Sequence, residues 1–165
     1  MRKIGDILFI IVIGIPLAIL SIPVMLFFLP IDYFNKKRFE KKYSEFLTKN
    51  NGKNFFCFNN RKNSKEYIEE IIAPNLLESI EIVYLNGKKI ESEYDSEFIS
   101  AALYGLKKYN KFPHLMKIRN GKLIDKSINN AFYSVLNMNK SKTELLNKIN
   151  MFFELNKIKN DPKTI

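Results

Sequence analysis

The chain has 165 residues, with 27 Lys or Arg against 17 Asp or Glu, one cysteine and one histidine. A single cysteine excludes an internal disulfide and any metal site built from several cysteines. His114 is the only histidine, so a serine–histidine or cysteine–histidine nucleophile would have to use it as the base. No acidic residue stands at a known spacing from it to complete such a site. The length is enough for one domain with a real core beside an N-terminal apolar run.

That apolar run is uncharged and extends from Ile7 to Leu29. At about 1.5 Å per residue it covers a hydrocarbon core of roughly 30 Å, so it predicts a membrane-spanning helix. The run continues into Pro30 without a small-residue cleavage site, which favours an uncleaved anchor over a signal peptide. Pro16 and Pro23 predict a kink and leave a re-entrant hairpin open as the alternative.

Basic residues flank the run on both sides and are denser after it. Because Lys and Arg are retained on the cytoplasmic side, the following domain is expected to face the cytoplasm from the inner (cell) membrane. Anionic lipid headgroups attract such residues by about 1 kcal/mol each, so the bilayer is the expected partner and nucleic acid is not. The residues expected at the membrane surface are Lys36, Lys37, Arg38, Lys41 and Lys42.

An apolar stripe follows the same basic cluster. Phe39, Tyr43 and Phe46 recur at i, i+4 and i+7. This spacing predicts a short amphipathic helix that lies on the bilayer or on the domain, rather than a stacking platform for nucleic acid.

With Asp6 near its start and Ser21-Ile22-Pro23 near the expected break, the N-terminal segment resembles the membrane hairpin of monotopic phosphoglycosyl transferases. The resemblance ends with this segment. The catalytic Asp-Glu pair of that family has no clear counterpart in the chain, so no site residue is carried over. A kinked single anchor therefore remains the main interpretation of the run.

The remaining sequence alternates between strand and helix patterns. Capping residues, a capping box and an Asn-Gly turn punctuate it. The expected elements are a buried strand at Asn54–Phe58, a helix that begins at a cap at Ser64 and is kinked by Pro74 before Leu76 and Leu77, a strand at Ile80–Leu85, a helix from a cap at Asp95 or Ser96 to Tyr109–Lys111, a hairpin of Leu115–Arg119 and Leu123–Ile128, and a helix opened by Ser141-Lys142-Thr143-Glu144. The order β-α-β-α-β-β-α predicts an α/β fold with a mixed sheet covered by helices.

That order, Pro74 within IIAPNLLESI, and the stretch FPHLMKIRNGKLI together resemble the thioredoxin-like superfamily over roughly residues 54–155. The resemblance implies a thioredoxin-like β-α-β-α-β-β-α sheet, a cis peptide bond before Pro113 and a hairpin turn at Arg119–Lys122. The C-x-x-C motif of the family is missing at the start of the first helix, where polar residues stand instead. Because thiol exchange needs a thiolate at that place, the redox activity of the family is not carried over.

The resemblance still implies a platform on which such folds hold an extended peptide by backbone pairing. Its candidate contact residues are Phe112, Pro113, His114, Arg61, Lys62, Asn63 and Ser64. The alternative is that these residues only close the fold. Cys57 lies in the apolar stretch NFFCF, which predicts a buried and inert thiol.

These features divide the chain into a membrane anchor (1–35), a basic juxtamembrane amphipathic segment (36–53), a thioredoxin-like domain (54–156) and a polar tail (157–165). The expected function is a membrane-anchored, non-redox binding or accessory module, for example of the immunity type, that acts on a protein partner and is not an enzyme. Two alternatives stay open: an enzyme or accessory factor for a lipid-linked substrate, and a redox protein that uses Cys57. The sequence points to no cofactor and no metal.

Overall fold

The computed structural model describes residues 9–106, 110–138 and 140–155, without the side chains of residues 24–29. The chain forms two compact units, residues 1–44 and 45–165. Each unit is described by itself.

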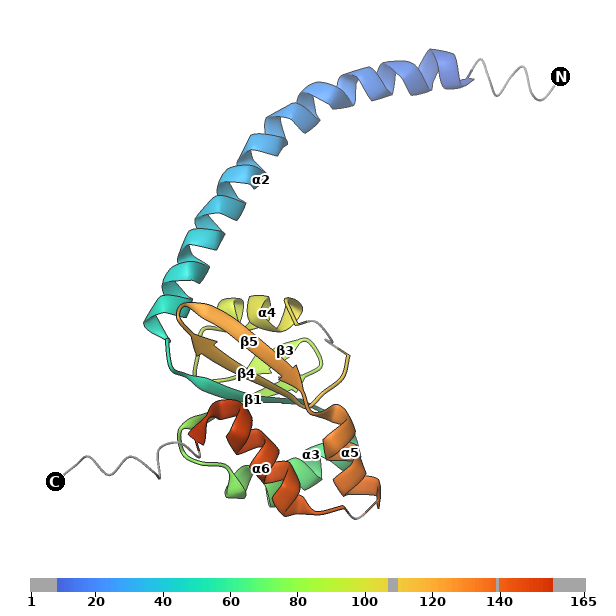
Figure 1. Cartoon of the computed structure of the whole chain (residues 1–165). Coiled ribbons are helices and arrows are strands. Elements are labelled where there is room, and N and C mark those ends of the chain that lie inside the picture. Colours follow the sequence, from blue (N-terminus) through green and yellow to red (C-terminus); the bar gives the residue numbers. More distant parts are fainter. Residues whose placement is uncertain (1–8, 107–109, 139, 156–165) are drawn as a thin grey trace. The chain divides into compact units, whose positions relative to one another are not determined.

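The first unit is helical. A π-helical turn, η1 (Ile10–Gly14), leads into the long helix α2 (Ile15–Lys49), whose last turn already belongs to the second unit. Pro23 and Pro30 lie inside α2, each removing one N–H donor, yet the helix continues through both (Figure 1). Within the described residues the helix continues without the break that a re-entrant hairpin would need.

The described apolar side chains of this unit, from Phe9 to Ile22, are exposed. Among the described residues, no helix combines the length and the apolar character needed to cross a membrane. Residues 7 and 8 of the expected anchor, and the side chains of residues 24–29, lie outside the described part of the chain.

The second unit is built on a five-stranded mixed sheet in the order β3-β2-β1-β4-β5. β1 is parallel to β2 and antiparallel to β4, so Phe56 stands opposite Ile82 on one side and Leu115 on the other. The strands are β1 (Asn54–Asn59), β2 (Ile80–Asn86), β3 (Lys89–Glu91), β4 (His114–Arg119) and β5 (Lys122–Ser127). The prediction of an α/β fold with a mixed sheet is confirmed.

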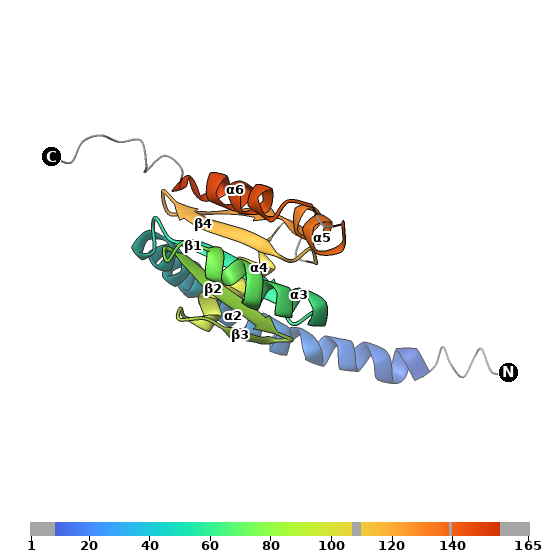
Figure 2. The ribbon, with the colours of Figure 1, turned by 90° about the horizontal axis from the view of Figure 1, so that it is seen from below.

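Helices cover both faces of this sheet. α4 (Ser96–Tyr104) lies on one face, and α3 (Lys62–Tyr67), α5 (Asn129–Met138) and α6 (Lys142–Phe153) lie on the other (Figures 1 and 2). After α3 the chain continues through the π-helical turn η2 (Ile68–Ile72) and the short 3₁₀ turn η3 (Ala73–Asn75), which contains Pro74. The proline therefore ends the helical segment instead of kinking a longer helix.

The central strand β1 is buried on both faces because it has a neighbour on each side and helices above and below. Its run NFFCF carries apolar side chains at successive positions, as a doubly covered strand requires. Phe56 and Phe58 join a core under α3, α5 and α6, with Phe132 and Ile149 among its members. Each such side chain contributes about 1.5–3 kcal/mol on burial.

The helix that follows β1 begins differently from the prediction. α3 starts at Lys62 after Arg61, and Ser64 lies inside its first turn, where its hydroxyl donates to the Arg61 carbonyl at 2.9 Å. The expected cap at Ser64 is therefore wrong. Two other caps are confirmed, because Asp95 accepts from the Glu97 N–H at 2.9 Å and Ser141 accepts from the Glu144 N–H at 3.3 Å.

Three further differences concern element boundaries. α4 ends at Tyr104, before the expected end at residues 109–111, of which 107–109 lie outside the described chain. β3 forms inside the polar stretch 88–94, and α5 follows β5 directly; neither element was predicted. The stripe expected to form a short helix belongs to α2, and its last member, Phe46, stacks on Phe98 of α4 with ring centroids 5.0 Å apart.

Candidate functional site

The loop before β4 contains a cis peptide bond between Phe112 and Pro113, as the sequence resemblance implied. Its side chains are buried: Phe112 is 4% exposed and His114 is fully buried. The rings of Phe112 and His114 meet edge to face with centroids 5.2 Å apart. His114 Nδ1 lies 3.9 Å from a carboxylate oxygen of Asp125 on the neighbouring strand β5. The loop therefore presents little side-chain surface to a partner.

The backbone of this loop is fastened to the start of α5. The carbonyl of Lys111 accepts from the Ser127 hydroxyl at 2.6 Å, and the carbonyl of Phe112 accepts from the side-chain amide of Asn129 at 2.5 Å. The Pro113 carbonyl accepts from the Ile128 N–H at 3.0 Å. An extended peptide that paired with this backbone would meet carbonyls already engaged within the fold.

The opposite group of predicted residues lies where β1 passes into α3. Arg61, Lys62 and Asn63 are exposed, whereas Ser64 is 4% exposed and holds the first turn of α3. From each group the structure brings one residue to a common pocket of the described chain: Arg61 from one and Phe112 from the other.

Arg61 and Phe112 share an open pocket of about 200 Å³ at the carboxyl ends of β1 and β2. Ligands of open α/β sheets bind at this end of the strands. The pocket is lined by Asn59, Asn60, Arg61, Leu85, Gly87, Asn110 and Phe112. The other predicted contact residues are not among those lining it.

Asparagine side chains dominate the polar lining of this pocket. Asn60 is held in place from both ends, because its N–H donates to the Leu85 carbonyl at 3.1 Å and its side-chain amide donates to Asn86 at 3.4 Å. Each asparagine offers a donor and an acceptor, as a peptide group does, and Arg61 adds a cationic fork. Among the described lining residues, none carries a carboxylate, a thiol or an imidazole. The lining therefore offers hydrogen-bond donors and acceptors together with one cation.

Sequence reasoning found Arg61 and Phe112 but missed Asn59, Asn60 and Asn110. The available signal was a polar pair directly after the buried stretch NFFCF, at the end of a strand where such sites form. Asn110 carried no local signal, because only the fold brings it beside the other two.

Cys57 lies in the middle of β1 and is fully buried. Burial raises the pKa of its thiol far above the ordinary value, because the thiolate would lose its hydration. The nucleophilic form is therefore disfavoured in the folded protein. Within the described residues, no group of three or more His, Cys, Asp or Glu is placed to hold a metal ion.

The expected membrane-surface residues lie on α2 within the first unit. All five are exposed: Lys36, Lys37, Arg38, Lys41 and Lys42. Lys37 also stands over the ring of Tyr33, one turn earlier, with its ammonium 4.9 Å from the ring centroid. They form a basic stretch that follows the apolar run along the same helix.

Comparison of the chain with family models, with curated proteins and with solved structures found no match.

Proposed function

We propose that the chain is a membrane-anchored binding module whose second unit is a non-redox, thioredoxin-like domain, and that it engages a protein partner at the cytoplasmic face of the cell membrane. The observation that carries the proposal is the amide-lined pocket at the carboxyl ends of β1 and β2, with Asn59, Asn60 and Asn110 around Arg61. It offers peptide-like hydrogen bonding without a reacting group.

Several features of the second unit support a thioredoxin-like assignment. The sheet has β1 between a parallel β2 and an antiparallel β4, with β5 completing a hairpin at the edge. A cis-proline precedes β4, and helices lie on both faces. β3 is an addition beyond β2. The missing C-x-x-C motif and the buried Cys57 favour a role without thiol chemistry.

The chemistry of the pocket favours a peptide segment of the partner as its ligand. Side-chain amides can pair with both the N–H and the C=O groups of an extended chain, which a peptide offers at every residue. Arg61 would add a fork for a carboxylate or a carbonyl. Because the carbonyls of residues 111–113 are engaged by the start of α5, we place the contact on the pocket rather than on that backbone.

The uncharged run Ile7–Leu29 and the basic stretch that follows it support the anchored location. The exposed apolar side chains of the described part of the run favour an apolar surrounding, because water would solvate them poorly.

Site-directed photo-crosslinking in the native cell tests the pocket. A photoreactive amino acid at Asn60 should yield a discrete protein adduct in the membrane fraction, and Arg61→Ala in the same chain should abolish it. The matched control carries the photoreactive residue at Asn137, which is exposed on α5 and does not line the pocket. Equal adducts from both positions, or an adduct with the mass of a lipid-linked compound, would contradict the proposal.

A further inference from the structure

Charge is strongly segregated within the second unit. Residues 66–97 carry nine acidic and two basic side chains, whereas residues 107–148 carry ten basic and two acidic ones. The first range includes β2 and β3 at one edge of the sheet, and the second includes β4 and β5 at the other edge, with α5 beyond them. The basic half is separate in sequence from the juxtamembrane cluster, and none of its lysines lines the amide-lined pocket.

Two hollows lie beside α5 in this basic half. The smaller, of about 100 Å³, is lined by Lys140, Lys148 and Glu144, with Ala131 and Ser134 also lining it. The larger, of about 310 Å³, is lined by three lysines together with Ser127, Asn130 and Ala131: these lysines are Lys111, Lys126 and Lys148. Because Ala131 and Lys148 line both hollows, the two are neighbours.

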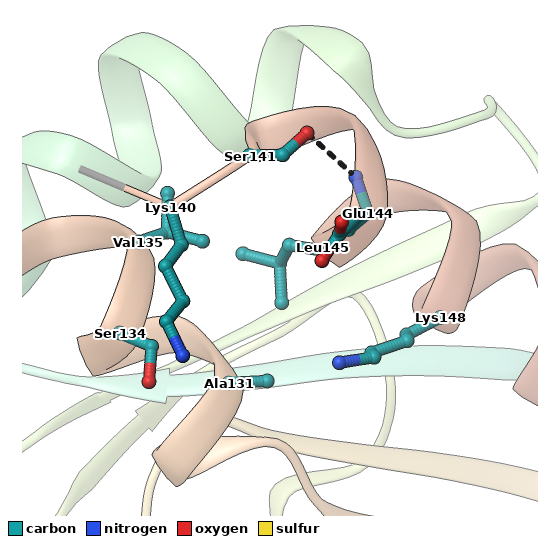
Figure 3. A pocket seen from close by; sticks show the side chains of 8 residues that line it. All are labelled: Ala131, Ser134, Val135, Lys140, Ser141, Glu144, Leu145 and Lys148. Atoms are coloured by element: carbon teal, nitrogen blue, oxygen red, sulfur yellow. Dashed lines mark hydrogen bonds between the residues drawn. The ribbon is translucent and has the colours of Figure 1, made fainter. Parts of the chain in front are cut away.

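Figure 3 shows how the lysines of the smaller hollow lie. The side chain of Lys140 descends from the α5–α6 connection toward Ser134, and that of Lys148 extends from α6 toward Ala131, so both ammonium groups point into the hollow. Ala131 and Ser134 have small side chains, which leave the hollow between the two lysines unfilled. Glu144 lies at the start of α6, where its N–H donates to the Ser141 hydroxyl.

The Glu144 carboxylate also lines the smaller hollow, but it forms no ion pair with the lysines there in the described structure. None of the ammonium groups of Lys111, Lys126, Lys140 and Lys148 forms an ion pair or a hydrogen bond with another described residue. Some lysines elsewhere in the unit are paired, for example Lys53 with Glu81 at 3.2 Å and Lys65 with Glu69 at 3.7 Å, so what distinguishes these four is that they line neighbouring hollows. Gathering like charges around a hollow costs free energy that a bound anion would recover.

We propose that the two neighbouring hollows beside α5 bind a compact phosphate-bearing compound through Lys111, Lys126, Lys140 and Lys148. Their volumes suit a small molecule or a headgroup rather than a polymer. Lysine is a strong point-charge donor to phosphate, and Ser127 and Asn130 add neutral hydrogen-bonding groups at the rim. The phosphate can belong to a soluble compound or to a lipid headgroup, since both present the same charged oxygens.

Lysine footprinting on the full chain in neutral detergent tests this site. An amine-reactive reagent is applied with and without inorganic pyrophosphate, and labelling of each lysine is measured by mass spectrometry. We expect saturable protection of the four lysines and no protection of Lys142, which lies on α6 but does not line either hollow. Protection by micelles that contain phosphatidylglycerol, but not by pyrophosphate, would identify a lipid headgroup as the source of the phosphate.

Variants separate the site from general basicity. Lys140→Gln with Lys148→Gln should weaken pyrophosphate binding about tenfold or more, measured as protection of Lys111 and Lys126, because charge-assisted contacts are lost. Lys142→Gln with Lys62→Gln removes the same net charge and should leave the binding unchanged. Equal weakening by both pairs, no protection by either probe, or stronger and wider protection by an oligonucleotide that includes Lys142 would overturn the proposal.

Discussion

Lys117 is a buried lysine in the middle of β4, with only 9% of its side chain exposed. A buried ammonium is costly unless it is paired and hydrogen-bonded. Its Nζ donates to the Phe152 carbonyl at 2.7 Å, lies 3.1 Å from a Glu154 carboxylate oxygen and stands over the Phe152 ring. All three contacts hold the end of α6 against the sheet, where helix carbonyls lack intrahelical partners.

Replacing Lys117 with methionine keeps the apolar stem but removes the bonds to the end of α6. We expect a loss of about 1–3 kcal/mol in the free energy of unfolding, because the Phe152 carbonyl loses a charged donor. Urea unfolding followed by circular dichroism measures it. Lys122→Met, at an exposed position of β5, is the matched control and should change stability by less than about 0.5 kcal/mol. Similar losses in the two variants would remove the role assigned to Lys117.

A second residue-scale prediction concerns the thiol of Cys57. Because the thiol is fully buried, a neutral-pH alkylating reagent should leave the folded protein unlabelled and should react once the chain is unfolded in urea. Rapid labelling of the folded protein, at the rate of the unfolded chain, would contradict burial and revive a thiol-based function.

The same thiol predicts a pH dependence of stability. Burial raises the pKa of Cys57, so above about pH 8.5 the unfolded chain loses this proton while the folded protein keeps it. The unfolded state then binds fewer protons, and stability falls with rising pH by up to about 1.4 kcal/mol per pH unit. Cys57→Ala should lack this component of the slope between pH 8 and 10. Parallel slopes for the two proteins, from urea titrations at each pH, would argue against it.

Among the elements, α6 shows that not every apolar residue on one side of a helix is buried in the core. The spacing of five apolar residues after the capping box predicts that they share one face of the helix: Leu145, Leu146, Ile149, Phe152 and Phe153. In the structure, Leu145, Ile149 and Phe153 are fully buried at i, i+4 and i+8, whereas Leu146 and Phe152 are half-buried at the border of the core. The helical period places only the first three toward the sheet.

Truncation of neighbouring leucines tests this assignment. Leu145→Ala should lower the free energy of unfolding by about 2–5 kcal/mol through a cavity under α6, whereas Leu146→Ala should cost less, because its side chain is already partly in water. Thermal or urea unfolding of the two variants compares them directly. A larger loss for Leu146→Ala would mean that α6 is rotated relative to the structure described.

Elements with strong local chemistry could be predicted from the sequence. Asp95, Ser141 and the Asn120-Gly121 turn specify their backbone within a few residues, so they hold independently of distant contacts. β3 and α5 could not, because three-residue β3 exists through its pairing with β2, and α5 buries only Phe132 and Val135. Their stability comes from tertiary contacts that local pattern does not reveal.

The candidate site, too, could be predicted only in part from the sequence. The resemblance to thioredoxin-like proteins led to the loop before β4 and to the start of α3, and Arg61 and Phe112 of those regions do line one pocket. The engagement of the Phe112 carbonyl by Asn129 depends on α5, which was not predicted, and the burial of His114 arises from tertiary packing that the local pattern does not reveal. The sequence therefore located the region of the pocket but not the side chains that dominate it.

At the scale of the whole molecule, the two units differ in the surface that they present. The described part of the first unit exposes apolar side chains from Phe9 to Ile22, followed along α2 by basic ones. The second unit buries its apolar side chains in a core around β1, with its exposed charges segregated by sign. Under the proposed function the first unit would anchor the chain and the second would bind a partner, so the two parts of the proposal can be tested independently.

The proposed orientation is tested by reporters fused after Ile165. Lys and Arg are retained on the cytoplasmic side, and the five basic residues between Lys36 and Lys42 outnumber Arg2 and Lys3 before the run. A fluorescent protein that matures only in the cytoplasm should therefore be bright, and an alkaline phosphatase fusion should be inactive, with both fusions remaining in the membrane fraction after carbonate washing. Changing the five basic residues to glutamine should weaken or invert this pattern, whereas changing Lys62, Lys88 and Lys89 should not, because charges far from the run have little influence on topology. Active phosphatase with a dark fluorescent fusion would overturn the orientation, and release of the unmodified chain by carbonate would overturn the anchor itself.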